Sequence, residues 1–462
     1  MKGALVMERL DVVIKNGKAV LPDGVKETDI GIKDGRIVAL QKGIQTNASV
    51  MLNAENQYIF PGVIDVHVHF SEPGRENWEG FHTGSMMMAA GGCTTYFDMP
   101  LNGIPSTVNV KALTEKAEIG KLKSFVDFSL WGGLVPGNEK DLEPLAEAGV
   151  IGFKAFLSET GNKEFSSVDD MTLLNGMKII AKTGKVLALH SESASITNWL
   201  KAEKEQEGAF SADDYLEARP IMAEVEAVER AIYYAELTGC PLHFVHISSA
   251  LAIEKIEQAK HSGMDITVET CPHYLLFNHQ HLRELGTIAK CAPPLREKEE
   301  QEKLISLVIN QKFDMVSSDH SPCPFDLKDP IKHHLFAAWG GISGGQFTLL
   351  SLLELAVKYN IPFETIAQLT ASAPAERFGL SERKGKIAVG FDADLAILSL
   401  EDSFTVTKEN FLAKHKESLY MGYTFPSKVV ATISKGKIVY QDGKVVAGKA
   451  NGEWVQSKKL NM

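Results

Sequence analysis

The sequence lacks several features that would assign it to a common class of protein. It has no run of about 18 apolar residues, which a membrane-spanning helix requires. Its five cysteines include no Cys-x-x-Cys pair, and an odd number cannot all be joined in disulfides. The first residues lack the apolar core of a signal peptide. We therefore expect a cytoplasmic protein with free thiols.

An excess of basic residues is also missing. Lys and Arg number 48 against 59 Asp and Glu, which gives a net charge of −11. A nucleic-acid-binding surface needs a basic patch, so we expect a small-molecule ligand and neither nucleic acid nor membrane as a partner. The composition, 44% hydrophobic and 23% charged, is that of a globular protein. At 462 residues the chain is long enough for a large barrel and a second domain.

Both ends of the chain predict short β-strands. Asn16-Gly17 and Asp34-Gly35 each separate two alternating apolar runs, which is the strongest short hairpin signal. The same texture returns in residues 385–398 and 428–446. We infer a small β-sandwich domain formed by both termini, residues 1–58 and 385–462, with a larger domain inserted at 59–384.

The middle of the chain predicts a TIM-type barrel of the α/β class, (β/α)8. Eight β-branched or aromatic runs alternate with helical stretches such as residues 225–239 and 299–310, as in repeated βα units. The predicted strands are residues 60–69, 93–99, 125–134, 150–157, 185–192, 241–249, 265–276 and 313–321.

Several of these strands end with residues of the types that bind metals. His67 and His69, two apart, point to the same face of the first strand. His190, His246 and Asp319 end the fifth, sixth and eighth strands. Active sites of such barrels lie at the carboxyl ends of the strands, so we expect the five side chains to meet there. Each alone is more often a polar strand end or a turn residue; together they indicate a metal centre.

Lys154 and His243 carry two further expectations. Lys154 lies between Phe153 and Ala155 in the fourth strand, where a charged amine is costly. The amine either reaches the barrel mouth or pairs with a carboxylate, or burial lowers its pKa and it adds carbon dioxide. His243 lies three residues before His246, so we expect it to face the helices.

A carbamylated Lys154 (N6-carboxylysine) would complete the site for two divalent metal ions. A carbamate has two oxygens, which could bridge metals about 3.5–4 Å apart. His67, His69 and Asp319 would hold one metal, and His190 and His246 the other. Imidazole and carboxylate ligands favour zinc and also suit cobalt, manganese or iron. The modification needs carbon dioxide or bicarbonate.

This ligand set resembles that of the amidohydrolase superfamily, in particular its cyclic-amide hydrolases: dihydroorotases, hydantoinases (dihydropyrimidinases) and allantoinases. The likeness extends to the tail, Lys384-Gly385 and Gly390 to Leu395. Ser71 stands where dihydroorotases have a carboxylate-binding Arg, and Glu159 where hydantoinases have a Tyr. The segments that resemble allantoinases are His67–Arg75, Trp78–Phe81, Asp98–Asn102 and Gly340–Gly345.

The resemblance implies hydrolysis of the cyclic amide of (S)-allantoin to allantoate in purine catabolism, by a homotetramer. A hydroxide bridging the two metals would attack the ring, with Asp319 as general base and then acid. Ser71, Asn102 and Ser321 are candidate substrate contacts; Asn102 could equally be a turn residue and Ser321 a cap.

Three alternatives are weighed against this function. The nearest is a hydantoinase or dihydropyrimidinase that acts on another cyclic ureide. A deaminase of the same superfamily would use one metal and lack a bridging lysine, which Lys154 argues against. A non-enzymatic interaction protein on this fold would have lost metal ligands, and all six positions are intact here.

Overall fold

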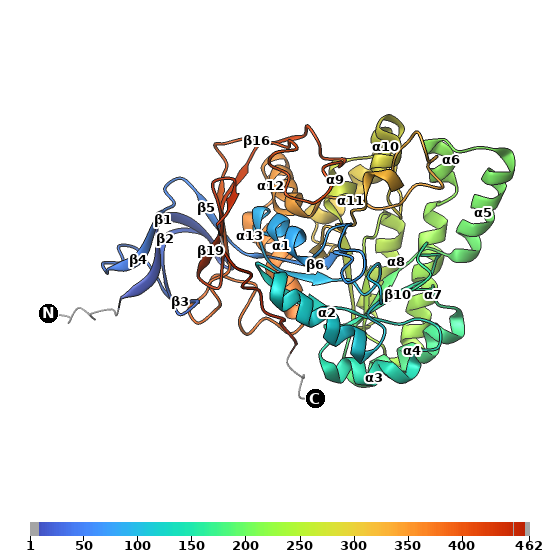
Figure 1. Ribbon diagram of the computed structural model, residues 1–462, viewed down its shortest axis with the longest axis horizontal. Coiled ribbons are helices and arrows are strands. Elements are labelled where there is room, and N and C mark those ends of the chain that lie inside the picture. Colours follow the sequence, from blue (N-terminus) through green and yellow to red (C-terminus); the bar gives the residue numbers. More distant parts are fainter. Residues whose placement is uncertain (1–8, 447, 458–462) are drawn as a thin grey trace.

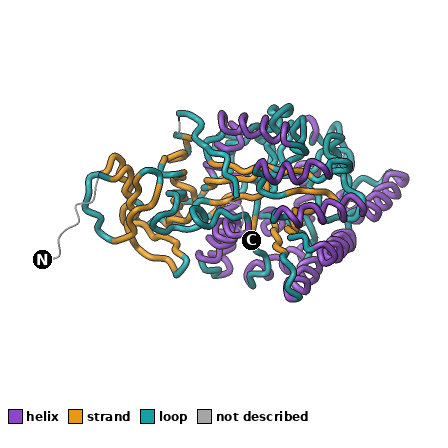
Figure 2. Tube along the Cα trace, turned by 90° about the horizontal axis from the view of Figure 1, so that it is seen from below, coloured by secondary structure: helices purple, strands orange, loops and turns teal. Residues whose placement is uncertain are grey.

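Figure 1 shows the computed structural model, in which residues 9–446 and 448–457 are described. A β-rich part built from both ends of the chain lies beside a larger α/β part. In Figure 2 the strands of the β-rich part gather at one end, while helices surround the strands of the larger part. Among the described residues, no helix is both long and apolar enough to cross a membrane.

The larger part is the predicted barrel. Eight parallel strands can be followed in the described residues, with β8 and β9 forming one strand interrupted at Trp131. The barrel closes where Val68 bridges to His320, and where the His69 amide donates to the His320 carbonyl at 2.8 Å. The strands are β6 (Val63–Val68), β7 (Cys93–Asp98), β8 (Asp127–Leu130), β9 (Gly132–Gly133), β10 (Phe153–Phe156), β11 (Leu187–His190), β12 (Leu242–Phe244), β13 (Ile266–Thr270) and β14 (Met315–Val316).

Helices follow the strands and cover the barrel. The helical stretches expected at 225–239 and 299–310 are α7 and α11. α7 begins after Pro220 and ends at Gly239, whose φ of 68° is favourable for glycine. The helices are α1 (Phe81–Ala90), α2 (Val110–Lys123), α3 (Glu139–Ala148), α4 (Asp170–Thr183), α5 (Ala194–Glu207), α6 (Ala212–Glu217), α7 (Ile221–Thr238), α8 (Ala250–His261), α9 (Pro272–Leu276), α10 (His279–Leu285), α11 (Lys298–Ile309), α12 (Thr348–Tyr359), α13 (Phe363–Ala367) and α14 (Ala373–Arg377).

The β-rich domain is a nine-stranded sheet drawn from both termini, as expected. Its strands share one apolar core that includes Ile14, Ile32, Ile397 and Ile433. The boundaries at residues 58 and 384 stay a prediction. The strands are β1 (Leu10–Leu21), β2 (Gly24–Lys33), β3 (Arg36–Gln41), β4 (Ala48–Asn53), β5 (Tyr58–Pro61), β15 (Leu395–Ser399), β18 (Lys428–Ser434), β19 (Lys437–Gln441) and β20 (Lys444–Val445).

Two local expectations were wrong. Asn16-Gly17 does not close a hairpin: β1 runs through it, and the register with β2 shifts between Ile14 and Gly17. A β-bulge uses the same left-handed residue as a hairpin turn, and Asn16 has φ 62°. The strand expected at 265–276 ends at Thr270, because Pro272 opens helix α9. The Asp34-Gly35 hairpin between β2 and β3 is confirmed.

A buried ion network joins the two domains. Lys384 Nζ lies 2.8 Å from Asp127 Oδ2, at the first residue of β8, and 2.5 Å from Asp394 Oδ2. Lys435 Nζ lies 2.8 Å from the other Asp127 oxygen. The tail motif therefore has a structural role: its lysine and aspartate connect the C-terminal strands to the amino end of a barrel strand.

Candidate active site

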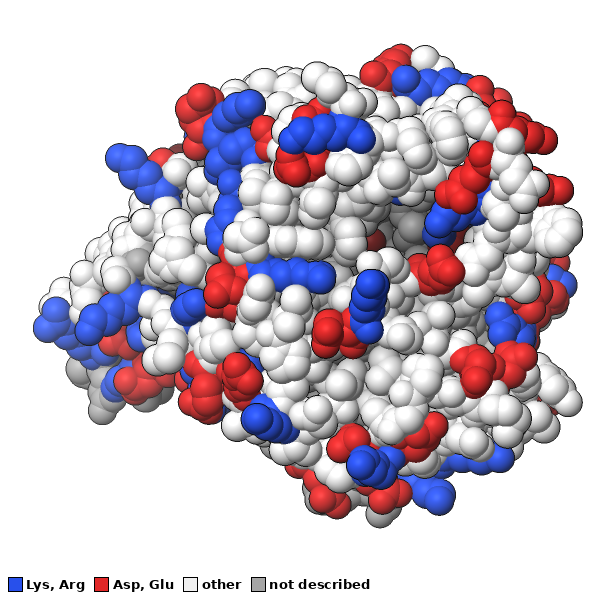
Figure 3. All heavy atoms as spheres, turned by 45° about the vertical axis from the view of Figure 1, so that its right-hand side comes forward, with Lys and Arg blue, Asp and Glu red and all other residues white. Residues whose placement is uncertain are grey.

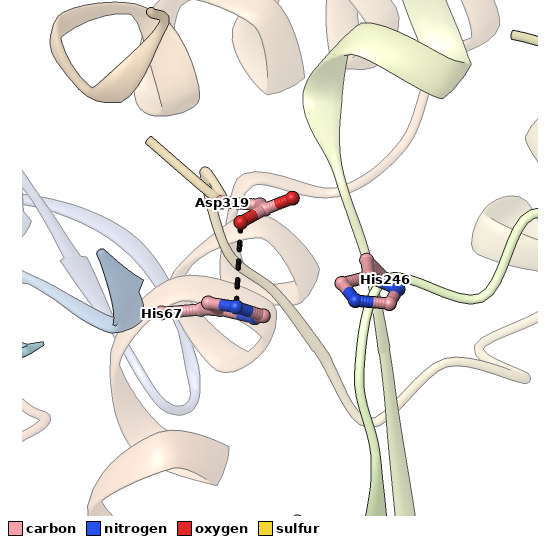
Figure 4. A group of neighbouring side chains, drawn as sticks. All are labelled: His67, His246 and Asp319. Carbon is pink, nitrogen blue, oxygen red and sulfur yellow. Dashed lines mark ion pairs between the residues drawn. The ribbon is translucent and has the colours of Figure 1, made fainter. Parts of the chain in front are cut away.

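The six predicted ligands converge at the carboxyl ends of the barrel strands. His67 belongs to β6 and His69 follows it, Lys154 lies within β10, and His190 ends β11. His246 and Asp319 lie two and three residues after β12 and β14. All six are buried. Figure 4 shows His67, His246 and Asp319 reaching toward one another from three separate elements.

Nitrogen and oxygen atoms meet within this cluster. Asp319 Oδ1 lies 3.3 Å from His67 Nε2 and 3.2 Å from His69 Nε2. His190 Nδ1 lies 3.1 Å from His246 Nε2. One potential ligand atom each from His67, His246 and Asp319 lie within 4.8 Å of one another. Residues far apart in the sequence thus form one compact donor set.

An unusual backbone conformation sets the side-chain direction of four candidate residues. His246 (φ 41°), Asp319 (φ 45°), Ser71 (φ 61°) and Asn102 (φ 72°) all have the left-handed conformation, which is uncommon for residues other than glycine. In this conformation the chain leaves the extended strand, so simple alternation fails at the strand ends.

His243 is the residue whose orientation the strand alternation predicted wrongly. It does not face the helices: its Nε2 lies 3.3 Å from Glu269 Oε2 and its Nδ1 lies 2.9 Å from Thr267 Oγ1, both on β13. Its ring also contacts Phe378 at 5.8 Å, inside the barrel. Two residues three apart both reach the interior because His246 departs from strand geometry.

Lys154 has the environment that a neutral amine needs. Its side chain is fully buried, and Nζ has no hydrogen-bond partner among the described residues. Burial lowers the pKa of Lys154 from 10.5 to about 7, although Asp319 and Glu269 partly oppose the shift. The amine lies 4.9 Å from the centre of the Phe156 ring. A substantial neutral fraction is therefore available at neutral pH.

The charge states of the neighbouring groups favour metal binding. Burial alone would raise the pKa of Asp319, but His67 and His69 outweigh it and hold the pKa at about 2. Burial lowers the pKa values of His67, His190 and His246. At neutral pH the site therefore offers a carboxylate and neutral imidazoles, the forms that bind metals.

Unpartnered atoms test whether the residues fit a metal. His69 Nδ1, His246 Nδ1 and Lys154 Nζ are buried and lack hydrogen-bond partners among the described residues. Buried polar atoms are nearly always paired. The opposed nitrogens of His190 and His246 are also suited to share one cation. The donor set fits a divalent metal centre of imidazoles and oxygen ligands.

A cavity of about 360 Å³ opens above the cluster. His67, His69, His190, His246 and Asp319 line it, together with the predicted contacts Asn102 and Ser321. Ser71 is not among the described residues that line the cavity, although it is buried and its Oγ is unpartnered. Figure 3 shows a hollow in this half of the molecule, with Lys or Arg atoms at its edge. The volume suits a small molecule.

The sequence interpretation missed the basic wall of the cavity and two buried carboxylates. Lys201, Arg219 and Lys290 line the cavity. Glu192 and Glu269 each contact one of the clustered histidines. A signal existed for the two glutamates, because an acid two residues after His190, or within a buried strand, needs a partner. The basic residues lie on helices and loops whose course the sequence did not reveal.

The fold and the site together define a hydrolase of the metal-dependent barrel class. A family model described as the amidohydrolase family matches residues 58–439. The chain belongs to the amidohydrolase family.

Its similarity to particular members extends over the whole length. It is 55% identical over 450 residues to an allantoinase of Bacillus velezensis, covering 97% of this chain and 98% of the relative. It is 43% identical to an allantoinase of Deinococcus radiodurans, covering 98% and 100%. The solved L-hydantoinase (dihydropyrimidinase) of Arthrobacter aurescens has a TM-score of 0.93 at 32% identity, covering 97% of this chain and 100% of that chain.

Proposed function

We propose that the protein hydrolyses the cyclic amide of (S)-allantoin to allantoate in purine catabolism. The observation that carries this proposal is the full-length similarity to allantoinases, at 55% identity for the Bacillus velezensis protein. The hydantoinases share the fold at lower identity, 32% for the Arthrobacter aurescens enzyme. Glu159, which lines the cavity where hydantoinases carry a Tyr, also disfavours that alternative.

The six clustered residues are proposed to hold two divalent metal ions, with zinc preferred and cobalt, manganese or iron possible. His67, His69 and Asp319 would bind one ion, and His190 and His246 the other. Support comes from the convergence of their nitrogen and oxygen atoms and from the unpartnered buried atoms among them. When bound, such ions polarise an amide carbonyl and make a water molecule more acidic.

Lys154 is proposed to contribute as a carbamate. Its neutral Nζ would attack the carbon of carbon dioxide and release one proton, forming an N–C bond and a carboxylate-like group. The buried amine, with its pKa lowered to about 7 by burial, supports this reaction. The product would give both metals an anionic oxygen ligand.

Asp319 is proposed to move the proton during hydrolysis. With a pKa of about 2 it is ionised at neutral pH and can accept a proton from the attacking water. The water oxygen bonds to the ring carbonyl carbon, the ring C–N bond breaks, and Asp319 returns the proton to the leaving nitrogen. One water is consumed, and no residue of the protein needs to act as nucleophile.

The cavity wall is proposed to recognise the ureide. Allantoin combines a hydantoin ring with a ureido group and presents many amide donors and acceptors. Asn102 and Ser321 line the cavity, and Asn102 Oδ1 has no partner among the described residues. Ser71 is proposed as a third contact, although it is not among the described residues that line the cavity.

A substrate panel with metal analysis tests the function. Allantoin, dihydrouracil, hydantoin and dihydroorotate would be assayed on one preparation whose metal content is measured. Preference for allantoin with about two metals per chain is the expected result. Preference for another ring would reject the substrate and retain the metal centre. Full metal content without activity on any ring would reject the proposed function.

The assembly and location are proposed on narrower grounds. The family resemblance supports a homotetramer, and sedimentation equilibrium of the purified protein would test it. The five cysteines are free and buried, which supports a reducing compartment such as the cytoplasm. Fractionation of cells that produce the protein would test this location.

A further inference from the structure

Glu269 binds one side of the His67 ring. It lies on β13 and is fully buried, and its Oε1 is 2.6 Å from His67 Nδ1. The other carboxylate oxygen lies 3.3 Å from His243 Nε2, and His243 continues to Thr267 at 2.9 Å. Both oxygens of Glu269 are therefore engaged, and the carboxylate has one orientation.

Glu192 lies beside the His190 ring as Glu269 lies beside the His67 ring, but it contacts Nε2 instead of Nδ1. Its Oε2 lies 2.8 Å from His190 Nε2, and it is buried. Arg219, which lines the cavity, forms an ion pair with the same oxygen. The His190 ring is also stacked on Phe156 at 4.7 Å, so the ring plane is fixed as well.

Glu269 contacts Nδ1 of His67, whereas Glu192 contacts Nε2 of His190, and this difference decides which nitrogen of each ring carries the proton. A neutral imidazole has one N–H and one nitrogen lone pair. A carboxylate oxygen accepts, so the ring nitrogen that is hydrogen-bonded to it carries the N–H. At His67 this nitrogen is Nδ1, which lies 2.6 Å from Glu269, whereas the 3.3 Å contact of Nε2 with Asp319 is longer and is an ion-pair contact only. His67 then presents the lone pair of Nε2, and His190 presents that of Nδ1, which faces His246.

We propose that Glu269 and Glu192 are positioning residues that set His67 and His190 in opposite tautomers, one for each half of the metal centre. This inference rests on the metal site of the proposed function and deepens it. A carboxylate behind a ligating histidine fixes the ring and strengthens the lone pair on its far side. Neither glutamate touches the substrate in this scheme; each acts through its histidine.

The other contacts of the two acids agree with this geometry. Glu192 forms an ion pair with Arg219 as well as its contact with His190. Glu269 lies between the rings of His67 and His243. Each carboxylate is therefore placed as an acceptor between two donor groups.

The first test reads the tautomers directly in metal-free protein. Long-range nitrogen–proton NMR spectra of protein labelled with ¹⁵N-histidine distinguish a ring protonated at Nδ1 from one protonated at Nε2. We expect His67 to carry its proton on Nδ1 and His190 on Nε2, with assignments made by replacing each histidine in turn. The same tautomer at both residues, or Nε2–H at His67, would overturn the inference.

The second test measures metal binding in Glu269→Ala and Glu192→Ala. The wild-type protein should retain two metals per chain. Each single variant should bind one of the two metals about 10–100-fold more weakly. The double variant should bind both metals more weakly by the same factor. Glu269→Gln and Glu192→Gln keep an acceptor oxygen and should recover part of the loss. Chelator competition gives the affinities without any substrate.

A matched control separates positioning from folding. Asp394→Asn alters a buried acid in the domain-joining network, away from the metal cluster. It should lower the melting temperature while both metals bind normally. Metal affinities unchanged in both glutamate variants would refute the inference. Because neither test uses allantoin, a wrong substrate would be revealed separately by the substrate panel.

Discussion

Replacing Lys154 with methionine should stabilise the metal-free protein while abolishing its function. In the folded chain without metal or bicarbonate, the Lys154 amine is buried and unpartnered, which lowers its pKa from 10.5 to about 7. In the unfolded chain the amine keeps its ordinary value. Between these pH values the unfolded state binds a proton that the folded state lacks, so this group makes stability rise with pH.

The size of the effect follows from the two pKa values. Their difference of about 3.5 corresponds to about 5 kcal/mol of destabilisation, complete below pH 7 and absent above about pH 10.5. Methionine has a similar length and no charge, and a repacking cost of at most about 1.5 kcal/mol is typical. Lys154→Met without metal should therefore be about 3–5 kcal/mol more stable than wild type at pH 7.

Urea unfolding of both proteins between pH 7 and pH 10, after chelation and without bicarbonate, measures this difference. Lys116→Met is the matched control, since Lys116 is equally buried but lies 2.5 Å from Asp98 Oδ2. Its loss should destabilise the fold by about 3–5 kcal/mol. A Lys154→Met protein no more stable than wild type at pH 7, or a gap that does not narrow as the pH rises, would refute the reasoning.

Three further predictions concern the site and the domain junction. Asp319→Ala should lower kcat for allantoin by at least about 100-fold and reduce bound metal, because it removes a ligand and the proton carrier; near-normal turnover would contradict this role. Asn102→Ala should raise KM for allantoin about 10-fold with kcat largely kept, since it removes a polar group from the cavity wall; an unchanged KM would exclude the contact. Lys384→Met should lower the free energy of unfolding in urea by about 3–5 kcal/mol, because Asp127 and Asp394 stay buried without their lysine partner. The metal content of the folded protein should stay at the wild-type level, and a variant as stable as wild type would show that the network contributes little.

The barrel and the gathering of the six candidate residues at its mouth could be predicted because their signals are local. β-branched runs mark the buried strands, and a polar residue at the end of such a run lies at the mouth of the barrel. The helices expected at 225–239 and 299–310 are present as α7 and α11, and their signal in the sequence is also local. The placement of His190 and Asp319 followed from strand order alone.

The parts that could not be predicted depend on backbone geometry or on partners far away in the sequence. Asn16-Gly17 supplies a left-handed residue, and this serves a bulge as well as a turn. His243 and His246 reach the same interior only because His246 has a positive φ, which no side-chain pattern reveals. Glu269 lies 202 residues from His67, so their 2.6 Å contact emerges only when the barrel closes.

The left-handed conformations of His246 and Asp319 have a consequence for the evolution of this enzyme. A residue other than glycine held in this region costs on the order of 1–3 kcal/mol, so the fold gives up stability at both positions in order to direct these two side chains. Replacement by glycine would relieve that strain but would also remove a buried side chain and leave a cavity, so neither position offers a simple gain in stability. Lineages in hot environments would have to gain their robustness elsewhere, and the small β-rich domain, remote from the chemistry, has the most freedom to supply it.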